Sequence, residues 1–296
     1  METLNLTYPS LGNIDFLKTK YPDGQQDIKI MLKNQMTPKS VMIKSRLTNF
    51  KDLELIICAT KALRNMGIKE IYLYTPYLLG SRSDRLFEYG GTSYLRDVVT
   101  PILNAQNYEK VITLDVHSDV AEACINNLSV RNNHAFVYHF INHLFNDGKE
   151  FALVSPDAGA LKKVWSLSRY LKSNDVNISD DIIIASKHRD ISTGEITHTN
   201  VPLNAGEYTN NRFLIVDDIC DGGRTFIEIG KVIKSMRPDS KIYLYITHGI
   251  FSKGMYELSK YFDGIFSTNS YSDIDVSEFS DYTVGDNFLN QYNVYE

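Results

Sequence analysis

The segment from Arg212 to Thr225, RFLIVDDICDGGRT, combines residue types that together can bind a phosphorylated sugar. An apolar run leads into Asp217 and Asp218, and a turn with two glycines then opens an amphipathic stretch. Unpaired backbone N–H groups at a helix N-terminus attract anions, and glycine lets the backbone approach a phosphate closely. Acids at the carboxyl end of a strand can accept hydrogen bonds from sugar hydroxyls. The segment therefore predicts a phosphate site beside a ribose site; the alternative is an ordinary strand-to-helix turn with solvated acids.

Lys187 and Arg189 are a second candidate for chemistry. Residues two apart in an extended segment project to the same side, so both cations can face one ligand. They stand at the start of a polar stretch, residues 188–211, that lacks a core pattern and is predicted to be a long loop or loose hairpin. Long loops in compact domains are often functional, and a loop that closes over phosphates excludes water. The alternative is a solvated surface pair.

Histidines and cysteines give weaker signals. His117 follows an apolar run and an acid, where a neutral imidazole could bind a metal or a metal-held phosphate, although a lone histidine there is also commonly structural. His139 and His143 have the i, i+4 spacing of zinc ligands, but no third ligand is nearby and an aromatic-rich core helix is the favoured interpretation. Cys220 has no evident catalytic partner and is expected to pack.

Short β-branched runs alternate with amphipathic segments along most of the chain, which is typical of βα units that form a mainly parallel sheet. Helices are predicted at 52–66 and 225–236, where apolar residues recur on one face. The strings EKVITLDVHSD and NRFLIVDDICD share an apolar strand that ends in acids, which favours two similar α/β domains. The predicted strands are residues 39–45, 69–75, 110–116, 150–156, 181–187, 212–218, 241–247 and 263–269.

The length of 296 residues is enough for about two domains of ordinary size. The turn-forming string NDGK at 146–149 places the predicted boundary between domains 1–147 and 148–296. With 36 acids against 31 Lys and Arg, the net charge is −5, which opposes a broad basic surface for nucleic acid or an anionic membrane.

No segment approaches the roughly 20 apolar residues of a membrane span. Three widely spaced cysteines without a C-x-x-C pair indicate neither a disulfide framework nor a zinc site. These features predict a cytoplasmic protein that has no membrane or nucleic-acid partner.

Six motifs give the chain a resemblance to a known family. The Arg212–Thr225 segment resembles the sugar-phosphate fingerprint of the phosphoribosyltransferase superfamily, and the other motifs occur in the order seen in ribose-phosphate pyrophosphokinases. That family resemblance implies two phosphoribosyltransferase-like α/β domains, each a mainly parallel sheet flanked by helices, with ATP on the first and the ribose phosphate and a catalytic loop on the second. The further motifs are YPDGQ at 21–25, SRSDR at 81–85, LDVHS at 114–118, VSPDAG at 154–159 and THGIFS at 247–252.

The resemblance also implies a reaction. The β,γ-diphosphate of ATP would move to the anomeric C1 hydroxyl of ribose 5-phosphate, giving phosphoribosyl diphosphate and AMP, with Mg²⁺ as cofactor. It implies a homo-oligomer, from dimer to hexamer, with ATP sites shared between subunits. The residues that it assigns are Tyr21, Asp23, Gln25, Arg82, Ser83 and His117 for ATP, His117 and Asp157 for the metal, Lys187 and Arg189 for catalysis, and Asp217, Asp218, Asp221, Gly222, Gly223, Arg224 and Thr225 for the ribose phosphate.

The sequence departs from that family in its phosphate loop. The usual Asp-Thr-Ala-Gly-Thr is Asp-Gly-Gly-Arg-Thr at 221–225, which makes the loop more open and more basic. A second possible acceptor is therefore ADP-ribose, which would give ADP-ribose pyrophosphate for NAD synthesis. Ser83 replaces the usual Gln and Gln25 the usual Glu, so contacts to adenine would be altered.

Two further hypotheses place the chain in a different functional class. A plain phosphoribosyltransferase would consume the activated sugar, but it would not need the motifs at 81–85 and 114–118. Some relatives in the family are non-catalytic regulatory subunits. The presence of Lys187, Arg189, His117 and Asp157 argues against a regulatory subunit, because a scaffold has no physical need for all of them.

Overall fold

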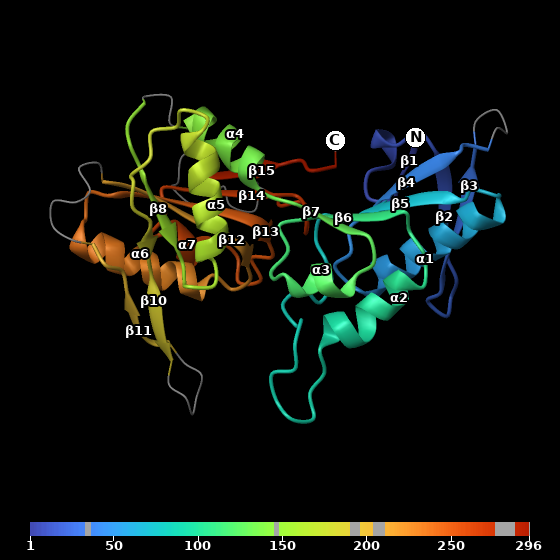
Figure 1. The fold of residues 1–296 in the computed structure, drawn as a ribbon, viewed down its shortest axis with the longest axis horizontal. Helices are drawn as coiled ribbons and strands as arrows, with labels where there is room; N and C mark the ends of the chain where they lie inside the picture. The colour runs from blue at the N-terminus through green and yellow to red at the C-terminus, as the bar shows by residue number, and fades with distance from the viewer. Residues whose placement is uncertain (33–36, 145–147, 190–195, 204–210, 276–287, 296) are drawn as a thin grey trace. The chain divides into compact units, whose positions relative to one another are not determined.

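The computed structural model describes all residues except 33–36, 145–147, 190–195, 204–210, 276–287 and 296. The side chains of residues 143, 144, 187–189 and 196–198 are also outside the described part. The chain divides into two compact units, residues 1–132 with 293–296, and residues 133–292. Each unit contains a parallel sheet flanked by helices (Figure 1), which confirms the predicted fold class.

The first unit is built on a five-stranded parallel sheet in the order β1-β4-β5-β6-β7. Its core lies between this sheet and α1, where Ile56 and Leu63 of the helix pack with Ile43 and Leu73 of the strands. The elements are β1 (Glu2–Asn5), η1 (Pro9–Leu11), β2 (Asp15–Lys20), β3 (Gln26–Met31), β4 (Ser40–Lys44), α1 (Phe50–Asn65), β5 (Glu70–Tyr74), η3 (Leu95–Val99), α2 (Thr100–Asn104), β6 (Lys110–Leu114), α3 (Val120–Cys124) and β7 (Leu128–Arg131).

The hairpin β2–β3 packs on α1 rather than joining the sheet. Its strands are antiparallel, and the Gln26 side chain donates to the Lys51 carbonyl at 2.6 Å and to the Glu54 carboxylate at 3.1 Å. The helix begins where Asn49 caps it, since the Asn49 side chain accepts from the backbone N–H groups of Lys51 and Asp52. The hairpin tip is thus carried on a fixed base.

The second unit is built on a six-stranded parallel sheet in the order β15-β14-β13-β12-β8-β9. A separate antiparallel hairpin, β10–β11, follows β9. The elements are α4 (His134–Leu144), β8 (Ala152–Ser155), α5 (Leu161–Lys172), β9 (Ile183–Ile184), β10 (Ser186–Arg189), β11 (Ile196–Asn200), β12 (Arg212–Cys220), α6 (Arg224–Met236), β13 (Lys241–Gly249), α7 (Tyr256–Ser259), β14 (Gly264–Thr268) and β15 (Leu289–Tyr292).

Both faces of the second sheet are covered. Phe213 and Ile215 of β12 pack with α6 residues, whereas Leu214 and Val216 pack with residues of α5. Figure 1 shows α4 and α5 on one face of the sheet and α6 on the other. A strand buried on both faces needs an uninterrupted apolar run rather than an alternating one, which explains the sequence FLIV in β12.

All eight predicted strands overlap an observed strand, with β12 and β13 each two residues longer than predicted, and the predicted helices correspond to α1 and α6. The compact units divide between Asn132 and Asn133, before the boundary expected after residue 147. The reason is α4, whose Val137 and Ile141 pack with Val164 of α5 in the second unit. The turn string at 146–149 therefore follows a helix that already belongs to the second unit.

In the described ranges, no helix is long and apolar enough to span a bilayer.

Candidate functional site

The carboxyl ends of β8 and β12 bring three predicted acids to one edge of the second sheet. The two strands are parallel neighbours, with Ile215 opposite Val154, and Asp157 comes two residues after β8. Asp217 and Asp218 lie near the end of β12; Asp217 is half-buried and Asp218 is 4% exposed. The predicted ribose site thus lies at the edge where open α/β sheets bind ligands.

The acids at this edge are electrostatically strained. Burial, followed by the adjacent Asp218 carboxylate, raises the pKa of Asp217 well above its usual range, and Asp157 adds to the same shift. Lys163 Nζ of α5 lies 3.5 Å from Asp218 Oδ2 and offsets part of the negative charge. Crowded carboxylates of this kind favour a ligand that brings hydroxyl donors or a cation.

Asp157 also shapes the loop that carries it. Its Oδ1 accepts hydrogen bonds from the backbone N–H groups of Gly159 at 3.0 Å and Ala160 at 3.1 Å. The Ser155 hydroxyl donates to the Asp157 carbonyl at 2.8 Å. These bonds fix the turn between β8 and α5, so the Asp157 carboxylate has a defined place at the sheet edge.

The glycine turn after β12 leads directly into α6. Gly223 has a φ of 75°, in the left-handed region, and a Cβ there would lie 3.2 Å from Leu258. Helix α6 begins at Arg224, and no side chain caps its first turn among the described residues. Its first N–H groups therefore lack a side-chain acceptor, which an anion site at this position requires, and the phosphate site stays a prediction. Thr225 is half-buried and Arg224 is exposed.

The turn that follows β13 holds this loop in place. The Ser252 hydroxyl donates to Asp221 Oδ1 at 2.5 Å, and the Ser252 N–H donates to the Asp221 carbonyl at 3.1 Å. Asp221 is thus an anchor of the loop as well as a predicted ligand residue. The sequence motif at 247–252 gave Ser252 no role, because no spacing pattern links it to Asp221.

In the first unit, the predicted ATP residues of the hairpin lie at its tip. Tyr21 N–H donates to the Gln25 carbonyl at 2.9 Å, and Gln25 N–H donates to Asp23 Oδ1 at 3.1 Å. All three side chains are exposed, with Tyr21 at 49%. The tip is therefore an ordered turn that presents an aromatic ring to solvent.

The loops after β5 and β6 are tied together by Asp84. This carboxylate is buried and accepts two hydrogen bonds from Arg85, at 2.9 and 3.2 Å, and one from the Ser118 hydroxyl. The hydrogen bond from Arg85 is the main cause that lowers the pKa of Asp84. The predicted residues Arg82 and His117, which are exposed, therefore lie on two linked loops. Sequence reasoning found both loops but missed the link.

Ser83 has a local structural contact. Its hydroxyl accepts a hydrogen bond from the Tyr94 N–H at 3.3 Å, and its backbone carbonyl accepts one from Leu95 N–H at 3.0 Å. The residue joins the start of this loop to its end. Its expected contact with ATP stays a prediction.

The side chains of Lys187 and Arg189 lie outside the described part of the chain, and so does that of His143. The backbone places Lys187 and Arg189 on β10 of the β10–β11 hairpin, in agreement with the hairpin interpretation. His139 is exposed on α4, with its ring 5.4 Å from the Tyr292 ring, and α4 packs in the core as expected. Cys220 is fully buried, which confirms its packing role.

The expected metal pair, His117 and Asp157, belongs to different units. Within the described residues, no three His, Cys, Asp or Glu side chains converge on one point. Mg²⁺ in nucleotide enzymes is usually held by one or two carboxylates together with substrate phosphates. The acids at the second sheet edge fit an ion that is bound in that way.

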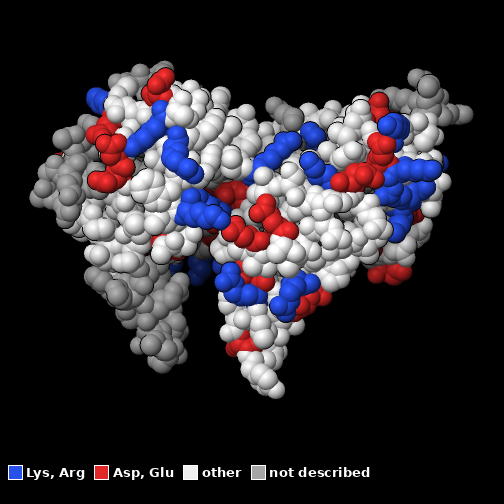
Figure 2. All heavy atoms as spheres, viewed as in Figure 1, with Lys and Arg blue, Asp and Glu red and all other residues white. Residues whose placement is uncertain are grey.

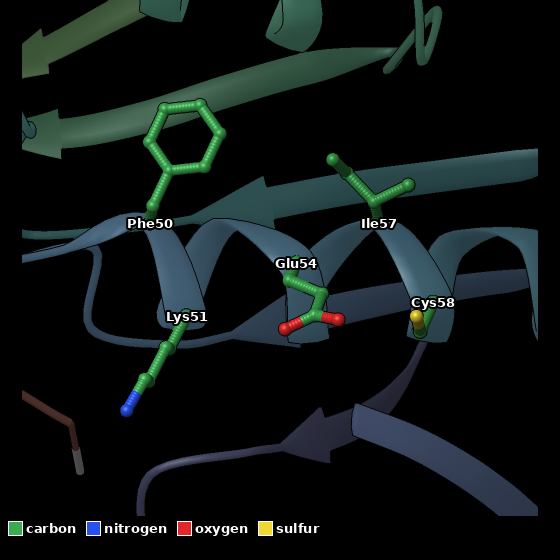
Figure 3. A pocket seen from close by; sticks show the side chains of 5 residues that line it. All are labelled: Phe50, Lys51, Glu54, Ile57 and Cys58. Carbon is green, nitrogen blue, oxygen red and sulfur yellow. The ribbon is translucent and has the colours of Figure 1, made fainter. Parts of the chain in front are cut away.

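Two hollows are lined by none of the predicted ATP, metal or ribose-phosphate residues. One, of about 380 Å³, runs along α1 and is lined by Phe50, Lys51, Glu54, Ile57 and Cys58 (Figure 3). The other, of about 200 Å³, lies between α4 and the strands β14 and β15 and is mainly aromatic. On the face shown in Figure 2, basic and acidic side chains are interspersed rather than separated into one-sign surfaces.

Comparison with known proteins identifies the family. The family described as "Phosphoribosyl transferase domain" matches residues 128–278, just over half of the chain. The chain belongs to this family. The curated relatives that it matches are ribose-phosphate pyrophosphokinases, the family that its motifs resemble.

The relatives are distant but extend over most of the chain. The ribose-phosphate pyrophosphokinase of Pyrococcus furiosus is 26% identical over 256 residues, 85% of this chain and 84% of that protein. That of Mycoplasmopsis pulmonis is 27% identical over 266 residues, 88% and 78% of the two chains. The crystal structure of a phosphoribosylpyrophosphate synthetase from Mycobacterium smegmatis matches with a TM-score of 0.73, covering 100% of this chain and 95% of that chain at 15% identity, which shows a shared fold.

Proposed function

We propose that the protein transfers the β,γ-diphosphate of ATP to the C1 hydroxyl of ribose 5-phosphate and releases AMP. The observation that carries the proposal is the second sheet edge, where Asp217 and Asp218 stand beside the glycine turn that opens α6. The names of the relatives support the same reaction.

In this reaction the C1 oxygen forms a bond to the β-phosphorus while the bond from that phosphorus to the bridging α–β oxygen breaks. The proton of the C1 hydroxyl passes to solvent, and the bridging oxygen leaves with AMP. Asp217 and Asp218 bind the ribose hydroxyls, and the N–H groups at 221–225 bind the 5′-phosphate. This orients the C1 oxygen toward ATP, which accounts for much of the rate gain in phosphoryl transfer.

ATP is held by the residues of the first unit. Arg82 and Ser83 on the loop after β5 and His117 on the loop after β6 contact its phosphates, and the hairpin tip with Tyr21, Asp23 and Gln25 contacts adenine. Because the tip is exposed, it can serve the ATP site of a second copy in a homo-oligomer. Light scattering of the purified protein tests the assembly, and a monomer that is fully active would contradict shared sites.

Charge is balanced by cations around the transferred group. Mg²⁺, held by Asp157, His117 and the ATP phosphates, would neutralise charge on the diphosphate as it moves. Lys187 and Arg189, on β10, stabilise the charge that develops on the leaving oxygen. The hairpin that carries them excludes water, which would otherwise hydrolyse the donor.

The direct test is AMP release from ATP and Mg²⁺, with ribose 5-phosphate present or absent, together with the mass of the sugar product. The expected result is AMP and phosphoribosyl diphosphate in equal amounts. If no AMP forms with ribose 5-phosphate or with ADP-ribose, the proposed transfer is wrong and the result favours the non-catalytic regulatory homologue.

ADP-ribose is the second candidate acceptor. The observation that favours it is the loop itself: Gly222 lacks a side chain, and Arg224 is exposed and has no hydrogen-bond or ion-pair partner among the described residues. A 5′-diphosphate would use the additional positive charge, and its free C1 hydroxyl permits the same transfer to give ADP-ribose pyrophosphate, a precursor for NAD synthesis. Turnover of ADP-ribose in a parallel reaction, at a higher kcat/KM than ribose 5-phosphate, would establish ADP-ribose as the acceptor.

A further inference from the structure

Lys253, in the turn after β13, lies over the glycine loop at 221–225. A Cβ added to Gly222 would lie 3.4 Å from the Cγ of Lys253, 3.6 Å from its Cδ and 3.7 Å from its Cε. The aliphatic part of Lys253 therefore covers Gly222 along most of its length. At these distances a Cβ at position 222 would make ordinary van der Waals contact with Lys253, so the lysine stem packs directly over the glycine.

The backbone that carries Lys253 is well fixed. Its neighbour Ser252 is bound to Asp221 by two hydrogen bonds, at 2.5 and 3.1 Å. On the other side, Gly254 N–H donates to the Phe251 carbonyl at 2.8 Å and closes the turn. The position of Lys253 beside the loop thus follows from the fold rather than from the side chain alone.

The charge of Lys253 is available to a ligand. Within the described ranges, its ammonium forms no hydrogen bond or ion pair, in contrast to Lys260 of the same region, which pairs with Glu257 at 2.5 Å. A lysine that lies on a loop of backbone donors and has no acid partner is suited to an anion, because its ammonium has three donors and a flexible stem.

We propose that Lys253 is a further acceptor-binding residue, whose ammonium binds the 5′-phosphoryl group of the acceptor sugar. This inference rests on the proposed function, since it assigns the loop at 221–225 to that group. The Lys253 ammonium would bind the phosphoryl oxygens together with the N–H groups of α6. The chemistry is the same for a 5′-phosphate and for the sugar-proximal phosphate of a 5′-diphosphate.

The test is Lys253→Met, which keeps the stem over Gly222 and removes the charge. Steady-state kinetics of AMP release with ribose 5-phosphate and with ADP-ribose should show KM for the turned-over acceptor raised about tenfold, with kcat and KM for ATP little changed. Lys253→Arg should recover most of the loss. Lys260→Met is the matched control, because it removes an equal charge from the same region.

Three results would overturn the proposal: an unchanged acceptor KM in Lys253→Met, an equal rise in Lys260→Met, or a loss confined to kcat. If the wild-type protein forms no AMP with either acceptor, the proposed function fails separately. Calorimetric titration of wild type and Lys253→Met with ribose 5-phosphate then decides the role of Lys253 alone: about tenfold weaker binding by the variant supports it, and equal binding or none contradicts it.

Discussion

The carboxyl edges of the two parallel sheets carry different kinds of residues. In the first unit, residues 293–295 of the chain's own C-terminal segment close the edge beside β4 and β5: Tyr295 is fully buried, Lys44 Nζ donates to its carbonyl at 2.7 Å, and the Tyr74 hydroxyl donates to the Val294 carbonyl at 2.8 Å. In the second unit, the corresponding edge carries crowded carboxylates and a glycine turn.

The difference shows that the same edge of a parallel sheet can either stabilise the fold or form a ligand site. The first edge is packed with rings and a guanidinium: Arg46 lies 5.3 Å from the Tyr8 ring centroid and 5.8 Å from that of Tyr295. Such contacts stabilise the fold. The second edge keeps like charges together, which costs stability and prepares a site for a polar ligand. The part of the first edge beside β4 and β5 that the C-terminal segment covers is therefore structural, and the second edge is the candidate acceptor site.

The largest expected effect comes from opening the packed edge. Tyr295→Ala removes a fully buried aromatic side chain and should lower the free energy of unfolding by about 3–5 kcal/mol. Chemical denaturation followed by circular dichroism measures it. Tyr89→Ala is the control, because Tyr89 is fully exposed and should change stability by less than about 0.5 kcal/mol. Equal effects of the two changes would show that the C-terminal segment does not close this edge.

At the candidate acceptor site we expect a substitution to lower activity without lowering stability. Asp217→Asn removes a carboxylate that would bind a sugar hydroxyl, so kcat/KM for AMP release should fall about 10- to 100-fold. Asp239→Asn, an exposed acid of the same unit, should leave it unchanged. An active Asp217→Asn enzyme would remove Asp217 from the ribose site.

Stability should move the other way in the same variant. Because the pKa of Asp217 is raised, the folded protein holds more protons than the unfolded chain between the usual carboxyl range and the raised value. Wild-type stability therefore falls as pH rises through that window, and Asp217→Asn should be less sensitive. Thermal unfolding at a series of pH values measures this dependence. If Asp217→Asn were less stable than wild type at neutral pH, the claim that the Asp217 carboxylate lowers stability would be contradicted.

Asp84 should behave as the opposite case. Its pKa is lowered, so its contribution is present above the ordinary carboxyl pKa and is lost as pH falls through the lowered value. Asp84→Asn weakens the link between the loops after β5 and β6 and should cost about 1–3 kcal/mol at neutral pH. Glu88→Gln, exposed on the same loop, serves as control. A loss that did not shrink at acidic pH would argue against this role of the charge.

The smallest effect concerns a single hydrogen bond at the packed edge. Tyr74→Phe removes the hydroxyl that donates to Val294 and should cost about 1 kcal/mol. Tyr72→Phe alters a neighbouring residue of β5 and should cost less. If Tyr72→Phe cost as much as Tyr74→Phe in urea denaturation, the bond to Val294 would contribute nothing.

The sequence predicted those helices and strands whose apolar residues form a regular pattern over a few consecutive residues. β12 and α6 were predictable because a buried apolar run and an amphipathic stripe are visible within a few residues. β1, β7 and β15 were not, since each is only 4 residues long and lies at a sheet edge or close to a turn. The domain boundary depended on α4, whose packing partner is not encoded nearby in the sequence.

The site followed the same rule. Asp217, Asp218 and the glycine turn could be found because they adjoin one another in the sequence. Lys163, Ser252 and Lys253 were missed because they reach the site from other loops and helices. Tyr295 was missed as a core residue because the short polar segment around it has no apolar periodicity that would predict its burial.

The most direct test of diphosphate transfer is phosphorus NMR of a reaction that contains the protein, ATP, Mg²⁺ and ribose 5-phosphate or ADP-ribose. We expect an anomeric diphosphate that grows one-to-one with AMP, without ADP, and that is nearly absent with Asp217→Asn. Formation of ADP, or AMP that forms equally without a sugar acceptor, would contradict diphosphate transfer at the second sheet edge.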